Sequence, residues 1–338
     1  MALSLELSSI IGCRSASMGI GDRWTRERWA NNNQSHLVGS LPMSEWVAWT
    51  LLAASMQAVR TAGQKYLHES LSALTATLAR YLFGLPVVLL YFLWLDPPIE
   101  QGTLSGVYLT KVIAAGSLQV IATILLVRLF SLRNFALGST LVRLEIMMTA
   151  LLGWLLFADA LPPIAWLGVG VASLGILSIQ RNPEEKLVFV MDRSVWFGLA
   201  SALAFSLTSL LIRDASLSLD IDHAPSAAVV TLLSMVIFQT GLCLALVGLQ
   251  KPNEFRELLV KWRLGLFIGV TGVLGSIGWF TAFTLERAAL VKTLGQIEFV
   301  FMLVISAFFF RERIKSHEWL GMGLICAGAM LLIWSNDL

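Results

Sequence analysis

Long apolar runs divide this sequence, and they constrain its fold more than any other feature. Each run has about 20 residues, the length that a helix needs to cross the hydrocarbon core of a bilayer. Clusters of charge, proline and asparagine separate ten such runs. They cover residues 45–63, 73–94, 109–129, 134–157, 163–179, 195–212, 225–249, 264–284, 289–310 and 318–335. The sequence therefore predicts an all-α integral membrane protein with about ten transmembrane helices.

The composition identifies lipid as the main solvent of this chain. Hydrophobic residues make up 57% of the sequence and charged residues only 14%, whereas soluble proteins carry about 25% charged residues. The formal net charge of +2 provides no basic surface for nucleic acid. We therefore expect the bilayer as a partner and no nucleic-acid binding.

The basic residues are distributed unevenly between the predicted connections. The odd-numbered connections hold 14 Lys and Arg residues, whereas the even-numbered ones hold only Lys111, Arg213 and Arg287. Because positive charge stays on the cytoplasmic side, the odd connections are expected in the cytoplasm of a bacterial inner membrane. Residues 1–43 carry no long apolar run and are expected to form a disordered tail, with Met43 as the preferred biological start.

The two halves of the chain contain an internal repeat. A shift of 153 positions aligns residues 136–180 with residues 289–333, and 11 of 45 positions are identical. Five spans per copy turn the second copy upside down in the membrane, an architecture that secondary transporters commonly use. We therefore predict two inverted five-helix repeats. Repeat 1 covers residues 44–180, a linker covers 181–194, and repeat 2 covers 195–338.

One motif occurs in both repeats. An apolar helix ends in an acid, as FAD with Asp159 and FRE with Glu312, and a Trp-Leu-Gly-x-Gly helix follows it. This arrangement resembles the drug/metabolite transporter superfamily, specifically its EamA-like ten-helix family. The resemblance implies transport of amino acids, metabolites or drugs. Family members often carry proline where Ile146 and Phe299 stand here, so no individual member's specificity is carried over.

Glycines in the fifth and tenth runs are candidates for close helix packing. Small residues let helix backbones approach where the solvent is itself apolar. These glycines are Gly168, Gly170, Gly175, Gly321, Gly323 and Gly328.

Four charged residues fall deep inside the apolar runs: Arg80, Arg143, Glu145 and Glu298. A charge at a helix centre costs about 2.5–3.5 kcal/mol on insertion scales, so each should face protein or water. Lys292 lies near enough to the end of its run to reach the interface. The two glutamates occupy equivalent positions in the repeats, each near the middle of its predicted helix, and are the first candidates for the translocation pathway.

Two interpretations of the glutamates remain open. Each exchanges a proton or accepts a cationic substrate group during transport, or each is a structural residue. In the second case, Arg80 or Arg143 neutralises Glu145, and Gln296, Thr293 or another helix binds Glu298. Helix residues two positions apart point away from each other, which favours Arg80 over Arg143 as the partner of Glu145.

Other polar residues in the runs are weaker candidates for the same pathway. Gln119, Gln239 and Tyr81 either line a cavity or hold helices together, and Trp279 is either a packing residue or a cavity wall. All four histidines lie in loops or the tail. Any proton coupling would therefore use the glutamates.

Other classes of membrane protein fit the sequence less well. No GxxxxGK[ST] motif is present, which excludes an ATP-driven pump, and no paired aspartates or Cys/His set predict an enzyme, a metal site or a cofactor. We expect a secondary transporter that moves a small organic solute by alternating access, with export as the favoured direction and protons as a candidate partner. A channel-like facilitator is the alternative, and the sequence leaves monomer and homodimer open.

Overall fold

A computed structural model describes residues 45–64, 72–100, 102–130, 142–157, 159–180, 193–309 and 316–336. All of them belong to one compact unit, residues 44–338. The predicted tail at residues 1–43, including the proposed start at Met43, lies outside the described residues, as does most of the predicted linker.

The described helices follow the predicted runs closely. Each of the ten runs contains a helix, and one further short helix, α11, lies between the seventh and eighth runs. In chain order the helices are α3 (Glu45–Gln64), α4 (Ala73–Leu95), α5 (Gly106–Phe130), α7 (Glu145–Leu156), α8 (Pro163–Gln180), α9 (Arg193–Leu217), α10 (Ala224–Gln250), α11 (Glu254–Val260), α12 (Trp262–Leu285), α13 (Ala288–Leu294), α14 (Ile297–Phe309) and α15 (Ser316–Asn336).

The lengths and hydropathies of these helices fit a bilayer. Within the described residues, seven helical segments are long and apolar enough to cross a membrane, and two shorter apolar helices cover Glu145–Leu156 and Pro163–Ile179. Large apolar side chains such as Leu90, Trp94 and Phe308 are exposed, as expected where lipid replaces water. The prediction of an all-α, multi-pass integral membrane protein is confirmed.

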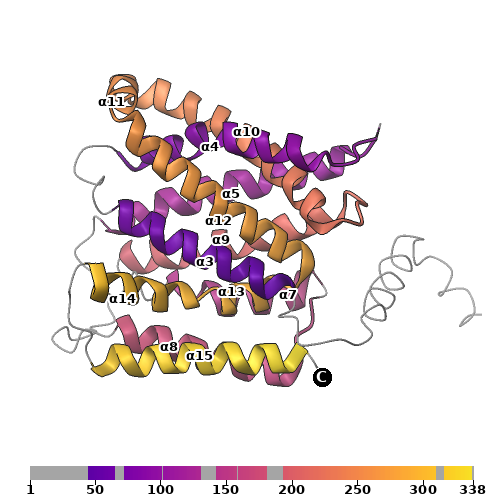
Figure 1. The fold of residues 1–338 in the computed structure, drawn as a ribbon, viewed down its shortest axis with the longest axis vertical. Coiled ribbons are helices and arrows are strands. Elements are labelled where there is room, and N and C mark those ends of the chain that lie inside the picture. Colours follow the sequence, from indigo (N-terminus) through magenta and orange to yellow (C-terminus); the bar gives the residue numbers. More distant parts are fainter. Residues whose placement is uncertain are drawn as a thin grey trace, which may run out of the picture. The chain divides into compact units, whose positions relative to one another are not determined.

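The helix contacts follow the inverted repeat. Helix α8 packs along its repeat counterpart α15, and the two lie side by side in Figure 1. Helix α5 packs on α9, and the equivalent contact joins α12 to α3. Likewise, α7 contacts α9 while α14 contacts α3. Each of these two cross-repeat contacts therefore has a counterpart in which the repeats exchange roles.

Close backbone contact between α8 and α15 depends on four glycines. A methyl group at Gly328 would lie 2.8 Å from the Gly168 carbonyl oxygen, and one at Gly175 would lie 2.8 Å from the Gly321 carbonyl oxygen. Each glycine therefore faces a glycine of the other repeat. Gly170 and Gly323 depart from the packing expectation, because a methyl group there would have no described atom of another element within 4 Å.

The ninth predicted run is not one continuous helix. Helix α13 ends at Leu294 and α14 begins at Ile297. Short i→i+3 bonds, including Glu298 N–H to Gly295 O at 3.0 Å, bridge the break. Its counterpart α7 begins at Glu145. The expectation that both glutamates lie near helix centres is therefore wrong, since each lies in the first turn of a helix.

The glycine contacts predict a position-specific response to added methyl groups. We expect G328A to lower the unfolding free energy by about 1–3 kcal/mol, because the backbone of α8 cannot move away without loss of packing. G323A on the same helix is the control and should be neutral or slightly stabilising, since alanine favours helix by up to about 1 kcal/mol. Thermal unfolding in detergent micelles measures both. Equal effects of the two substitutions would contradict this packing.

Candidate functional site

Glu145 is paired with a lysine from the other repeat. Lys292 Nζ, on α13, donates to Glu145 Oε1, on α7, and each side chain is 17% exposed. The predicted pairing of Glu145 with Arg80 is therefore wrong. Arg80 Nη2 instead donates to Ser276 Oγ on α12, at 3.1 Å.

The break in the ninth run explains why Lys292 is available. From its position in the apolar run, Lys292 was expected to reach the membrane interface. The structure instead places Lys292 in the last turn of the short helix α13, which packs against α7. A cation at a helix C-terminus and a carboxylate in the first turn of α7 are both favourable for the helix dipoles. Sequence alone supplies no signal for this pair, because its members are 147 residues apart.

Glu298 also contacts the opposite repeat. Gln57 Nε2, on α3, donates to Glu298 Oε2 at 2.6 Å. This contact agrees with the structural alternative in which another helix binds Glu298. Neither Gln296 nor Thr293 binds Glu298. Instead, Gln296 Nε2 donates to the Lys292 carbonyl oxygen, and Thr293 Oγ1 donates to the Ala289 carbonyl oxygen. In the sequence, Gln57 is distinguished only as the single amide side chain inside the first apolar run.

Trp279 connects the two glutamate contacts. Its Nε1 donates to Gln57 Oε1 at 3.1 Å, and Lys292 Nζ lies 5.7 Å from its ring centroid, within range of a cation–π interaction. A chain of contacts therefore runs from Glu298 through Gln57, Trp279 and Lys292 to Glu145. A methyl group at Gly295, in the break, would collide with the Trp279 ring. We call the five side chains in this chain of contacts, Glu298, Gln57, Trp279, Lys292 and Glu145, the glutamate network.

Two further predicted residues lie beside this network with incomplete partners. The Arg143 guanidinium stacks over the Phe299 ring at 4.2 Å and interacts electrostatically with Glu298 and Glu145. Arg143 Nε and Gln296 Oε1 are buried without a hydrogen-bond partner among the described residues. Buried polar atoms of this kind are rare in folded proteins and often mark functional positions.

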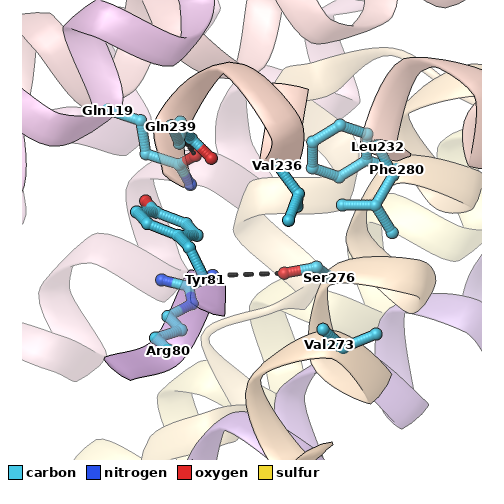
Figure 2. Close-up of a pocket in the computed structure, with 9 residues that line it drawn as sticks. All are labelled: Arg80, Tyr81, Gln119, Leu232, Val236, Gln239, Val273, Ser276 and Phe280. Carbon is cyan, nitrogen blue, oxygen red and sulfur yellow. Dashed lines mark hydrogen bonds between the residues drawn. The ribbon is translucent and has the colours of Figure 1, made fainter. Parts of the chain in front are cut away.

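The remaining predicted residues meet at a separate cavity, which we call the Arg80 cavity. Figure 2 shows Arg80, Tyr81, Gln119 and Gln239 on one side of it and apolar side chains on the other. Gln239 Nε2 donates to Gln119 Oε1 at 2.8 Å, which joins α10 to α5. The cavity has a volume of about 10 Å³, room for about one water molecule. The lining residues are Arg80, Tyr81, Gln119, Leu232, Val236, Gln239, Val273, Ser276 and Phe280.

Arg60 connects the cavity and the network electrostatically. It interacts with Arg80 and Tyr81 on one side and with Glu298 on the other. The count of basic residues per connection assigned Arg60 to the first connection, although the predicted run 45–63 contains it. Helix α3 continues to Gln64 and holds Arg60 inside the bundle. The position of Arg60 three residues after Gln57 on one apolar helix was the signal that sequence reasoning missed.

Polar contacts also join the helices at the ends of the bundle. Arg213, assigned by sequence to a connection, is buried near the end of α9. It donates to the Phe283 carbonyl oxygen at 2.6 Å and lies 3.5 Å from Asp159. Burial raises the pKa of Asp159, and nearby Arg213 opposes this shift.

Helix α11 is attached to the start of α4. Ser72 Oγ donates to Glu254 Oε2 at 2.5 Å, and Thr75 Oγ1 donates to the same oxygen. Burial alone would raise the pKa of Glu254, but these hydrogen bonds outweigh it and lower the pKa. Among the described residues, no group of three or more His, Cys, Asp or Glu side chains could hold a metal ion.

The Glu145–Lys292 pair predicts strong coupling between the two residues. We expect K292M and E145Q each to destabilise the protein by about 3–5 kcal/mol, because each leaves a buried charge without its partner. The double variant should recover much of this loss. K251M is the control, since Lys251 is 55% exposed and a surface ion pair contributes at most about 1 kcal/mol. Unfolding free energies from a double-mutant cycle test the coupling, and additive losses would contradict it.

Comparisons with known proteins identify the family. The model of the EamA-like transporter family matches residues 44–181 and 192–334, so the chain belongs to this family and each match covers one repeat. The chain is 27% identical over 140 residues to an uncharacterized transporter in the cobO 3'region of Sinorhizobium sp.. This match covers 40% of this chain and 94% of that protein. A crystal structure matches with a TM-score of 0.64 over 86% of this chain and 96% of the other, at 14% identity, which shows a shared fold. This protein is therefore a membrane transporter.

Proposed function

We propose that this protein is a secondary transporter that moves a small organic solute by alternating access. The pairing of α7 with α13, next to the break between α13 and α14 and the start of α7 at the equivalent position of repeat 1, is the observation that carries the proposal. Discontinuous helices at a repeat interface typically form the substrate and ion sites of secondary transporters. Movement of one repeat against the other would act directly on these contacts.

The glutamate network supplies the contacts that such a movement must change. Lys292 holds Glu145 and Gln57 holds Glu298, and in both pairs the partner comes from the other repeat. Separation of the repeats would therefore leave two carboxylates without their present partners. A buried carboxylate without a partner is costly, so protonation or substrate contact must accompany the change.

Glu298 is the proposed proton-exchanging residue. It accepts a hydrogen bond from the neutral amide of Gln57, whereas Glu145 is neutralised by Lys292. A carboxyl group held by an amide keeps a hydrogen bond in either protonation state, because the amide both donates and accepts. Glu298 can thus gain and lose a proton without collapse of its site.

Proton coupling predicts a specific effect of E298Q. In proteoliposomes, the variant should lose accumulation driven by an imposed pH gradient and keep exchange of solute between the two sides, because glutamine carries no proton. The solute is chosen by a growth screen of a deletion strain against amino acids, purines and toxic amphiphiles. E257Q, an exposed change on α11, is the control. Gradient-driven transport that persists in E298Q would exclude this role, and wild-type flux without response to the gradient would favour a facilitator.

We further propose that the protein lies in a bacterial inner membrane with its odd-numbered connections in the cytoplasm, and that it exports its solute. In a cysteine-free background, a cysteine at Arg256 should react with a membrane-impermeant maleimide only after cell lysis. A cysteine at Glu100 should react in intact cells. The reverse labelling would contradict the orientation, and solute uptake into inside-out vesicles tests the direction.

A further inference from the structure

The three basic residues of the even-numbered connections gather at one end of the bundle. These residues, Lys111, Arg213 and Arg287, are the exceptions to the charge asymmetry of the sequence. Lys111 Nζ lies 2.8 Å from Asp214 Oδ2, and Arg213 Nε lies 3.5 Å from Asp159 Oδ2. Arg287 interacts electrostatically with the same Asp159 carboxylate. The helix ends beside the second, fourth, sixth and eighth connections therefore each supply a charged residue. We call Lys111, Asp159, Arg213, Asp214 and Arg287 the even-side latch.

Both ion pairs of the latch cross the repeat boundary. Lys111 and Asp159 belong to repeat 1, whereas Arg213 and Asp214 belong to repeat 2. Arg213 is 4% exposed and Asp159 11%, while Lys111 and Asp214 are 22% and 41% exposed. A buried ion pair is costly to break, whereas an exposed pair contributes little. The Arg213–Asp159 pair is therefore the stronger of the two contacts between the repeats at this end.

Arg213 also binds the end of a helix that contacts the glutamate network. Its Nη1 donates to the carbonyl oxygens of Phe283 at 2.6 Å and Glu286 at 2.5 Å, at the C-terminus of α12. A cation is favourable at this end of a helix. The Phe283 ring stacks on Trp279 at 5.7 Å and lies 5.9 Å from Lys292 Nζ. Phe283 is one turn closer to the latch than Trp279, so Arg213 fixes a side chain that covers the network on the even side.

Movement of the two repeats must break these contacts together. Alternating access opens each end of the pathway in turn by moving one repeat against the other. The partners of Asp159 and Lys111 are the adjacent residues Arg213 and Asp214 at the end of α9. Repeat 1 therefore cannot separate from this end of α9 without loss of both pairs.

We propose that Arg213 is a positioning residue for the transport cycle, which closes the even-numbered side of the pathway by binding Asp159 and the C-terminus of α12. This inference rests on the proposed alternating access and assigns the contact that closes one side. Release of Arg213 from Asp159 opens that side to the glutamate network. The outer pair, Lys111 with Asp214, contributes a smaller part of the same closure.

A buried reporter cysteine tests whether Arg213 closes this side. Thr149 is fully buried on α7, one turn after Glu145 on the same helix face and toward Asp159. In a cysteine-free background, T149C is labelled with a membrane-impermeant maleimide in intact cells and in inside-out vesicles. Labelling of E100C identifies the preparation that exposes the even-numbered connections to the reagent.

We expect R213Q to raise the labelling rate of T149C by roughly tenfold, because the opening equilibrium loses a charged hydrogen bond. The increase should occur only in the preparation that also labels E100C. A merely structural defect would instead increase labelling from both sides. R256Q, on the exposed face of α11, is the matched control and should leave the rate unchanged. Equal acceleration from both sides in R213Q would overturn the proposal.

D159N decides the question if R213Q does not fold. It leaves Arg213 with its two carbonyl acceptors on α12, so we expect a folded protein whose T149C label forms about fivefold faster from the even side. Unchanged labelling in folded R213Q or D159N would refute the role of Arg213.

A charge exchange at the outer pair tests attraction between the repeats directly. K111E places two carboxylates together and should increase even-side labelling of T149C by about twofold to fivefold. The double variant K111E/D214K restores opposite charges and should return the rate toward that of the parent. Because both side chains are partly exposed, these variants should fold. Labelling in the double variant that is as fast as in K111E would contradict an electrostatic latch.

Transport assays separate this proposal from the proposed function. Even-side labelling that responds to R213Q and D159N, without counterflow of any screened solute in proteoliposomes, would support the closing contact and contradict the proposed transporter. Counterflow in the parent, with T149C labelling unaffected by both variants, would support transport and refute the role of Arg213.

Discussion

Charged side chains inside a lipid-solvated bundle must find partners within the protein, and the arrangement of the two repeats depends on this constraint. Each intramembrane carboxylate is held from across the repeat boundary, Glu145 by Lys292 and Glu298 by Gln57. Contacts of this kind within one repeat would add nothing to the helix packing that joins the halves. The same contacts that satisfy the buried charges therefore also join the repeats.

The repeats share a backbone plan but differ in their chemistry. Glu145 and Glu298 stand at equivalent positions, each in the first turn of a helix. Lys292 in repeat 2 corresponds to Ser139 in repeat 1, so the duplicated lysine site does not exist. One glutamate is consequently neutralised by a cation while the other is bound by an amide. This asymmetry gives the two residues different proposed tasks within one symmetric scaffold.

The glycine pattern shows how far sequence reasoning reaches. Spacing in two matching motifs drew attention to six glycines, and four of them make the backbone contact between α8 and α15. Gly170 and Gly323 repeat the motif equally well, yet a methyl group at either would meet no described neighbour. A sequence motif records the residue type at a position, but the rotation of a helix about its axis decides which neighbour that position faces.

The sequence by itself determined the spans, the internal repeat and the intramembrane charges, because transfer of a helix into lipid depends on the local chain and adds up residue by residue. The tertiary structure alone decided which charges meet. Because the helix breaks at Gly295, Glu298 lies at the start of a helix. Because α13 packs on α7, Glu145 pairs with Lys292, which hydropathy predicted to lie at the interface. Arg80, Gln119 and Gln239 likewise meet at one cavity only through the packing of the helices that carry them. The Glu145–Lys292 pair joins segments 147 residues apart, and no local property of the chain encodes that proximity.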